Sequence, residues 1–132
     1  MSENLATVQR IYEAFGAGDI PAILDCLADD VRWEAPGTGH GIPWLTPGIG
    51  KAHVGAFFGS LGALEFNEFA PLNMLVGGNQ VCAIIGAGIT VKATGKSLKD
   101  TEAHLWTFGP DGKVIEFQHL LDTAKQLDAL RP

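Results

Sequence analysis

The hydrophobic positions near the start of the chain recur every three or four residues, which is the spacing of an amphipathic helix. They predict a first helix over residues 3–18. Its apolar stripe consists of Leu5, Val8, Ile11, Tyr12 and Phe15. Asp19 then suits the N-cap of a second helix, with Pro21 in its first turn and its end at Asp29 and Asp30. The buried face of this second helix is expected to be Ile23, Leu24 and Leu27.

Residues 31–36 alternate between apolar and polar side chains, which predicts a short strand. Alternate side chains of a strand point to opposite faces of the sheet. Val31, Trp33 and Ala35 therefore share the face that is expected to look inward. Glu34 belongs to the other face and is expected on the outside.

A long segment rich in glycine and proline follows at residues 37–50, and it carries two large side chains, His40 and Trp44. A loop of this length is costly to order and often covers a binding site. The two side chains therefore belong either to a lid or to a mobile loop in solvent. A third helix is predicted over residues 51–63. Its apolar stripe is Val54, Phe57, Phe58 and Leu61.

From residue 64 onward the pattern changes to a period of two, which predicts β-strands. The expected strands are residues 64–75, 80–92, 96–108 and 113–121. Pro71 favours a bulge or a sheet edge in the first of them, while the second is apolar on both faces and is expected to be central. A last helix is predicted over residues 123–130, with Asp122 as its N-cap. Helices early and strands late predict an α+β fold, in which a curved antiparallel sheet encloses an apolar pocket.

The last two strands are joined by Pro110, Asp111 and Gly112, which are all turn-forming residues. Residues directly opposite in an antiparallel pair share one face of the sheet. The candidate register places Phe108 opposite Ile115, Trp106 opposite Phe117, His104 opposite His119 and Glu102 opposite Leu121. A bulge at the turn would shift this register by one and separate the two histidines. The sequence thus predicts two histidines together on an otherwise apolar face.

The bulk composition describes one ordinary globular domain over residues 1–132, with 46% hydrophobic and 18% charged residues. A net charge of −6 without a basic patch argues against nucleic acid and anionic membranes as partners. The chain has no apolar run of membrane-spanning length and no signal peptide, so a cytoplasmic location is expected. Cys26 and Cys82 lie far apart among apolar neighbours and are expected to be buried free thiols.

Several stretches of the chain resemble a known family. They are IYEAFGAGDIPAILDCLADDVRWEAPG, GKAHVGAFFGSL, VKATGK and HLWTF…DGKVIEFQHLLD. Together they resemble the SnoaL-like polyketide cyclase group of the nuclear transport factor 2-like superfamily, to which ketosteroid isomerases and limonene epoxide hydrolases also belong. The resemblance runs from about Leu5 to Asp122. It implies a cone-shaped, cystatin-like fold with a deep apolar pocket and a homodimer formed through the outer sheet face.

The resemblance also allows known catalytic patterns to be compared one position at a time. A ketosteroid isomerase has its catalytic aspartate where this chain has Ala35, its tyrosine near Ile11 and Tyr12, and its acid where this chain has His104. The epoxide hydrolases use an Asp–Arg–Asp arrangement. The arginines of this chain are Arg10, Arg32 and Arg131, and none lies on the later strands. Neither mechanism is therefore expected here.

The SnoaL-type cyclases place a histidine before the DGK turn and an aspartate after it. By resemblance these two positions are His104 and His119. A pair of imidazoles with apolar walls is suited to proton transfer, because burial and a second imidazole lower one pKa. The alternative is a pair of core histidines whose hydrogen bonds are satisfied by a tyrosine, the backbone or water. A metal site would need a third ligand from His40 or Glu102, and without a supporting spacing no metal and no cofactor are expected.

The predicted site combines the histidine pair as catalytic residues with a set of substrate-binding residues. The latter are Tyr12, Trp33, Trp44, Phe57, Trp106, Phe117, Leu121 and Asp122. For Asp122 the helix N-cap is the competing role. We expect a cofactor-independent enzyme of the isomerase, cyclase or lyase type for a small apolar or aromatic molecule, with residues 37–49 covering the site. The alternatives are a hydrophobic-ligand-binding protein and an interaction module that uses the outer sheet face.

Overall fold

The computed structural model describes residues 3–34 and 40–132. Helices and strands form an α+β fold, as predicted. The helices are α1 (Glu3–Ala17), α2 (Ile20–Asp25), α3 (Lys51–Ser60) and α4 (Thr123–Leu130), with 3₁₀ turns η1 (Pro43–Leu45) and η2 (Leu61–Ala63). The strands are β1 (Leu27–Trp33), β2 (Gly48–Ile49), β3 (Leu64–Gly77), β4 (Gln80–Val91), β5 (Ser97–Phe108) and β6 (Val114–Leu120). Among these, no helix is both long enough and apolar enough to cross a membrane.

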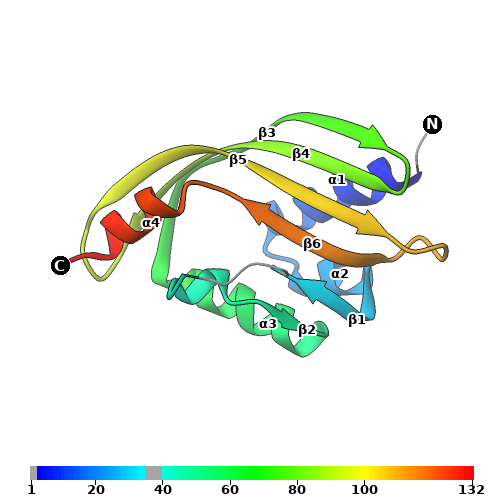
Figure 1. Cartoon of the computed structure of the whole chain (residues 1–132), viewed down its shortest axis with the longest axis horizontal. Coiled ribbons are helices and arrows are strands. Elements are labelled where there is room, and N and C mark those ends of the chain that lie inside the picture. The colour runs from blue at the N-terminus through cyan, green and yellow to red at the C-terminus, as the bar shows by residue number, and fades with distance from the viewer. Residues whose placement is uncertain (1–2, 35–39) are drawn as a thin grey trace.

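All six strands form one sheet in the order β2-β1-β6-β5-β4-β3. The β1–β6 pair is parallel and the other pairs are antiparallel. In Figure 1 the long strands β3, β4 and β5 arch over α1, and α3 lies beneath them beside β1. The curved sheet and the helices thereby face one another across the interior, where the site is found.

The four later strands begin and end within two residues of their predicted bounds, and Pro71 has the predicted position. It lies on β3, an edge strand, at a shift in register between Pro71 and Asn73. An edge strand and a bulge both suit proline, because it has no N–H for a ladder bond. β4 lies inside the sheet, between β3 and β5, and is buried along most of its length.

The second helix is shorter than predicted. It ends at Asp25, and the residues expected to end it, Asp29 and Asp30, lie within β1. The N–H of Val114 donates to the carbonyl of Cys26, so the chain joins β6 immediately after the helix. Leu27 is buried as predicted, but it is buried as a strand residue because apolar residues satisfy either pattern.

The predicted register of β5 and β6 is correct at the histidines and wrong at the turn. His104 pairs with His119 and Trp106 with Phe117, whereas Phe108 pairs with Val114 and not with Ile115. A bulge between Thr107 and Phe108 accounts for the difference. The strands pair one residue closer to the turn than predicted, and the extra residue in the bulge restores the predicted register, so the histidines face each other.

The main core is built around aromatic rings that also border the interior space. Trp33 stacks on Phe117 with ring centroids 4.2 Å apart, and Trp106 lies 4.5 Å from Phe117. All three side chains are buried. Cys26 and Cys82 are free and only half-buried, which corrects the expectation of full burial. The site described below is therefore supported by close aromatic packing.

Asp122 caps α4: its side chain accepts a hydrogen bond from the Lys125 N–H at 3.1 Å. We expect Asp122→Ala to lower the free energy of unfolding by about 1 kcal/mol, because an N-terminal donor of the helix loses its partner. Denaturant unfolding measures this loss. Asp128→Ala, which removes an exposed carboxylate from the same helix, is the control. Equal stability of the Asp122 variant and the wild type would contradict the capping role.

Candidate functional site

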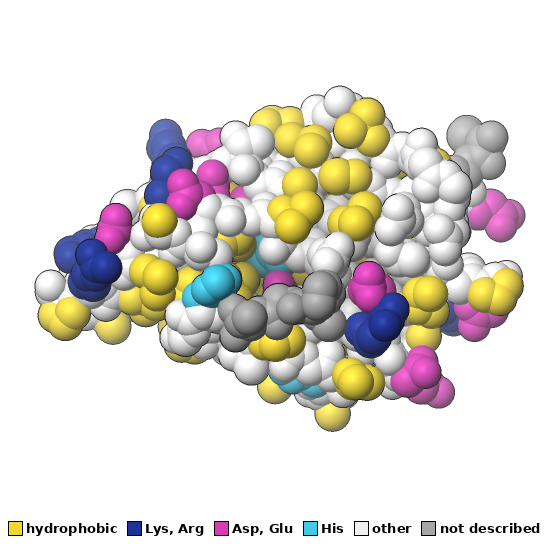
Figure 2. Space-filling model, in the orientation of Figure 1, with side chains coloured by type: hydrophobic (Ala, Val, Ile, Leu, Met, Phe, Trp, Pro, Cys, Tyr) yellow, Lys and Arg dark blue, Asp and Glu magenta, His cyan; other side chains and the backbone are white. Residues whose placement is uncertain are grey.

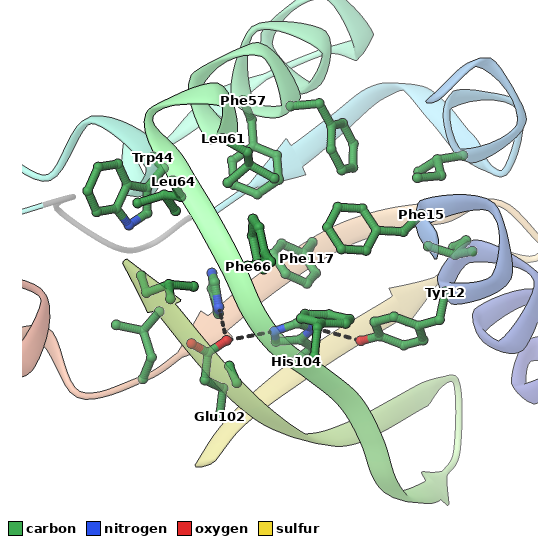
Figure 3. A pocket seen from close by; sticks show the side chains of 18 of the residues that line it. Tyr12, Phe15, Trp44, Phe57, Leu61, Leu64, Phe66, Glu102, His104 and Phe117 are labelled. Carbon is green, nitrogen blue, oxygen red and sulfur yellow. Dashed lines mark hydrogen bonds and ion pairs between the residues drawn. The ribbon is translucent and has the colours of Figure 1, made fainter. Parts of the chain in front are cut away.

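A cavity of about 80 Å³ lies between the helices and the inner face of the sheet. Its walls are mainly apolar and aromatic, and titratable side chains occupy one part of them (Figure 3). Figure 2 shows histidine and acidic side chains near the centre of one face, among apolar side chains. The predicted site residues that line the cavity are Tyr12, Trp33, Trp44, Phe57, His104, Trp106, Phe117, His119 and Leu121. Asp122 is not among the residues that line this cavity, and it has the competing predicted role, the N-cap of α4.

The two histidines lie side by side because β5 and β6 pair directly at these positions. Their ring centroids are 4.6 Å apart and the rings meet edge to face. Glu102 precedes His104 by two residues and therefore shares its face of β5. Glu102 Oε1 lies 2.8 Å from His119 Nε2 and 3.2 Å from His104 Nε2. One carboxylate thus joins both imidazoles, and the sequence had indicated it only as a possible third metal ligand.

Glu34 is the functional residue that sequence reasoning placed wrongly. It was expected outside, but it is buried, and its Oε2 lies 3.2 Å from His119 Nδ1. β1 ends at Trp33, and Glu34 has a φ of 62°, so the alternation of a strand no longer applies to it. The only sequence signal was Pro36 shortly afterwards, which disfavours a continued ladder. Ala35 and Pro36 lie outside the described residues, so the inward position expected for Ala35 stays a prediction.

Tyr12 connects the histidine pair to helix α1. Its hydroxyl lies 2.7 Å from His104 Nδ1 and accepts the Trp106 indole N–H at 3.1 Å. Because the indole can only donate, the tyrosine O–H is free to donate to His104 Nδ1. His104 then carries its own proton on Nε2 and donates it to Glu102 Oε1. Figure 3 draws the contacts from Tyr12 to His104 and from His104 to Glu102 as dashed lines. Each hydrogen bond from Trp106 through Tyr12 and His104 to Glu102 therefore has one donor and one acceptor.

The two histidines have opposite charge preferences. Burial, together with the charge of His119, lowers the pKa of His104 to about 4, although its bond to Glu102 acts the other way. Burial also disfavours a charged His119, but hydrogen bonds and charges from Glu102 and Glu34 raise its pKa to about 9. Burial would raise the pKa of Glu102, yet the bonds from both histidines lower it to about 2. Near neutral pH the cluster thus holds a neutral His104, a cationic His119 and an anionic Glu102.

The hydrogen bonds leave one carboxylate oxygen available for chemistry. Both ring nitrogens of each histidine are engaged, with Tyr12, Glu102 or Glu34. Glu102 Oε1 receives two of these bonds, and nothing in the described part of the chain hydrogen-bonds to Glu102 Oε2. Since Glu102 lines the cavity, it can exchange a proton with a bound molecule without breaking the network.

The same residues have a geometry that could hold a metal ion. One ligand atom each from Glu102, His104 and His119 lies within 4.8 Å of the other two. Two histidines and a carboxylate are a known donor set for divalent transition metals. The same side chains also hydrogen-bond to one another through Glu102 Oε1, and the proposed chemistry uses them in this hydrogen-bonded state.

Trp44 is not part of a mobile loop. It lies in η1, is buried, and its indole N–H donates to Gln126 Oε1 of α4 at 2.8 Å. The partners are 82 residues apart in the chain, so only the folded structure reveals their contact. His40 is exposed and has a φ of 50°. Residues 37–39 of the predicted lid lie outside the described residues.

The tyrosine hydroxyl is expected to stabilise the folded protein as well as orient His104. Tyr12→Phe leaves the buried Trp106 N–H and His104 Nδ1 without their shared partner. We expect a loss of about 1–3 kcal/mol in the free energy of unfolding, since unpaired buried polar groups keep their desolvation cost. Chemical denaturation measures the loss. Phe15→Leu, at a half-buried ring one turn along α1, is the control for aromatic packing. A Tyr12→Phe variant as stable as the wild type would contradict the relay.

Both the sequence and the fold of this chain match known proteins. The sequence profile of the SnoaL-like domain matches residues 8–117. A search of curated proteins found no match. A solved NTF2-like protein of unknown function from Burkholderia pseudomallei is similar over 100% of both chains, with 28% identity and a TM-score of 0.87.

Two further solved structures are similar in fold. TerC, crystallised with polyporic acid, has 22% identity and a TM-score of 0.80, over 97% of this chain and 98% of its own. A protein from Silicibacter, provisionally named a polyketide cyclase, has 18% identity and a TM-score of 0.79, over 98% of this chain and 96% of its own. At these identities the likeness concerns the fold alone.

Proposed function

The chain belongs to the SnoaL-like domain family of the NTF2-like superfamily, and from this premise we propose that it is a small-molecule enzyme of the cyclase or isomerase type. Its substrate is a small apolar or aromatic molecule with a carbonyl group. The reaction is proton transfer at the carbon next to that carbonyl. The name of the Silicibacter protein and the ligand of TerC support this class, although each belongs to a different protein.

A single observation carries the proposal: in an aromatic cavity, the buried Glu102 carboxylate keeps one oxygen free of hydrogen bonds from the described residues and lies beside a histidine that contacts two carboxylates. Glu102 Oε2 takes the proton, while Glu102 Oε1 keeps its bonds to His104 and His119. The cation on His119 is held by two carboxylates, so its position is fixed before the substrate arrives. Fixed charges in a water-poor site stabilise developing charge without having to reorganise.

The proposed step transfers a proton from the substrate to Glu102. The substrate C–H bond breaks, an O–H bond forms on Glu102, and the electron pair of the C–H bond becomes part of an enolate. The negative charge moves from Glu102 to the substrate and stays near His119, which offsets the weak basicity implied by a Glu102 pKa of about 2. Return of the proton to a different carbon gives an isomer. Attack of the enolate carbon on a second carbonyl of the same molecule closes a ring, and the alkoxide that forms takes the proton back from Glu102. No further cofactor enters either step.

Deuterium exchange tests the proposed step without knowledge of the natural substrate. The protein is incubated in D₂O with 2-tetralone, a fused-ring ketone with acidic hydrogens next to its carbonyl, and loss of those hydrogens is followed by proton NMR. Exchange faster than in buffer and in the presence of heat-denatured protein is expected. Binding of 2-tetralone without accelerated exchange would overturn the enzyme proposal and favour a ligand-binding protein. Absence of both would favour an interaction module.

A further inference from the structure

The indole N–H of Trp33 is a buried donor that has no acceptor. Among the described residues, Trp33 Nε1 is the one buried side-chain nitrogen or oxygen without a hydrogen-bond partner. The side chain is 1% exposed and lines the cavity. An unpaired buried donor costs about 1–3 kcal/mol and is uncommon enough in native proteins to require a reason.

The other two tryptophans of the chain show that this fold does provide acceptors for indole groups. Trp44 donates to Gln126 Oε1 at 2.8 Å, and Trp106 donates to the Tyr12 hydroxyl at 3.1 Å. All three indoles line the same cavity. Of the three, Trp33 alone has no acceptor among the described residues. An acceptor brought by a bound molecule would complete the set.

Trp33 also lies close to the proton-transfer cluster. Its ring stacks on Phe117 at 4.2 Å, and the Phe117 ring lies 5.4 Å from His104 and 5.7 Å from His119. Phe117 thus separates the unpaired indole from the two imidazoles. Trp33 and Glu102 line the same cavity, so a planar molecule bound against this aromatic wall would lie between them.

We propose that Trp33 Nε1 donates a hydrogen bond to an oxygen of the bound molecule and so determines which end of it faces Glu102. The ligand class that fits is a planar ring system with a carbonyl or phenolic oxygen, since the rest of the cavity is aromatic and apolar. The positioning effect on turnover rests on the proposed function, whereas the hydrogen bond itself is a binding interaction.

The bond gains strength as the reaction proceeds. A carbonyl oxygen becomes negative when its neighbouring carbon loses a proton, and a hydrogen bond to a charged acceptor is roughly twice as strong as one between neutral groups. The indole cannot transfer its own proton at ordinary pH, so it stabilises the charge without entering the proton balance. Trp33 is therefore a specificity-determining donor for oxygenated ligands.

Indole NMR distinguishes this role from simple packing. The ¹⁵N-labelled protein is titrated with 2-tetralone and, separately, with tetralin, which has the same ring skeleton without the oxygen. Trp44→Phe and Trp106→Phe assign two of the three indole signals and leave Trp33 by elimination. We expect 2-tetralone to shift the Trp33 N–H signal downfield and tetralin to cause a much smaller change. An unmoved Trp33 signal up to the solubility limit of 2-tetralone would overturn the proposal.

Affinity provides the second test, with Trp33→Phe as the variant and tetralin as the control ligand. We expect Trp33→Phe to weaken 2-tetralone binding by roughly 3–10-fold, the worth of one hydrogen bond, and to leave tetralin binding nearly unchanged. An equal loss for both ligands would mean that the indole only packs. Deuterium exchange separates the two proposals. A shifted Trp33 signal without accelerated exchange would overturn the enzyme proposal and leave the Trp33 hydrogen bond standing. Accelerated exchange without a shifted Trp33 signal would overturn the Trp33 hydrogen bond and leave the enzyme proposal standing.

Discussion

Glu102→Gln is expected to slow deuterium exchange from 2-tetralone by about 10²–10⁴-fold, the usual contribution of a general base. The amide has nearly the shape of the carboxylate and still occupies the wall of the cavity, but it cannot accept the substrate proton. Binding of 2-tetralone should change far less than the rate of exchange, because the ligand's apolar contacts remain. The rate is measured by NMR and the affinity by thermal shift at several ligand concentrations.

Glu65→Gln is the matched control for this substitution. Glu65 is an exposed carboxylate on β3, so its amide variant should retain the wild-type rate. A Glu102→Gln variant that keeps more than half of the wild-type rate would show that another group accepts the proton. The acid/base role would then have to be moved from Glu102 to one of the histidines.

His119→Leu is expected to lower the free energy of unfolding by about 3–5 kcal/mol near pH 7, because it leaves buried carboxylates without their cation. Those carboxylates are Glu34 and Glu102, and each is nearly inaccessible to solvent. Leucine fills a similar apolar volume, so most of the loss comes from charge. Denaturant unfolding over a range of pH measures it.

The pH dependence of this loss identifies its cause. His119 has a pKa of about 9 when folded and an ordinary value near 6.5 when unfolded. The stability that it provides is therefore fully present below about pH 6.5 and is lost as the pH rises through 9. The difference between wild type and variant should shrink above pH 9. It should also shrink in acid, as the unpaired carboxylates of the variant take up protons.

The double variant Glu34→Gln/His119→Leu is the control for His119→Leu. Removing one of the two unpaired carboxylates should recover part of the lost stability. If Glu34→Gln stabilises the His119→Leu variant more than it stabilises the wild type, the two residues are energetically coupled. His40→Asn replaces an exposed histidine in a left-handed conformation that asparagine tolerates, and it should leave stability unchanged. A loss for His119→Leu that is independent of pH would contradict the charge argument.

The histidine pair could be predicted from the sequence because its causes are local. A short turn and a period of two fix which residues of neighbouring strands face one another. The bulge after Thr107 offsets a turn that is one residue tighter than predicted, so His104 still faces His119. The long apolar stripes of α1 and the strands β4 and β5 were predictable for the same reason. The resemblance to SnoaL-like proteins predicted how these helices and strands are arranged in the fold.

The remaining features of the site depend on events that local patterns do not record. Glu34 enters the cluster because β1 ends one residue earlier and the backbone turns left-handed, which reverses the face expected from alternation. The end of α2 was misplaced because Leu27 satisfies a helix or a strand equally well. Trp44 is held by Gln126, 82 residues away, so its burial depends on tertiary packing. The missing acceptor of Trp33 can be recognised only when every neighbour is in place.

The central claim is that Glu102 lies between a cationic His119 and a neutral His104 in one connected cluster. A titration of the imidazole ¹⁵N signals by NMR, with His104→Gln and His119→Gln for assignment, tests it directly. The account predicts that His119 stays protonated until about pH 9 and that His104 stays neutral down to about pH 4. Two histidines that both titrate near pH 6.5, as separate exposed imidazoles do, would contradict it.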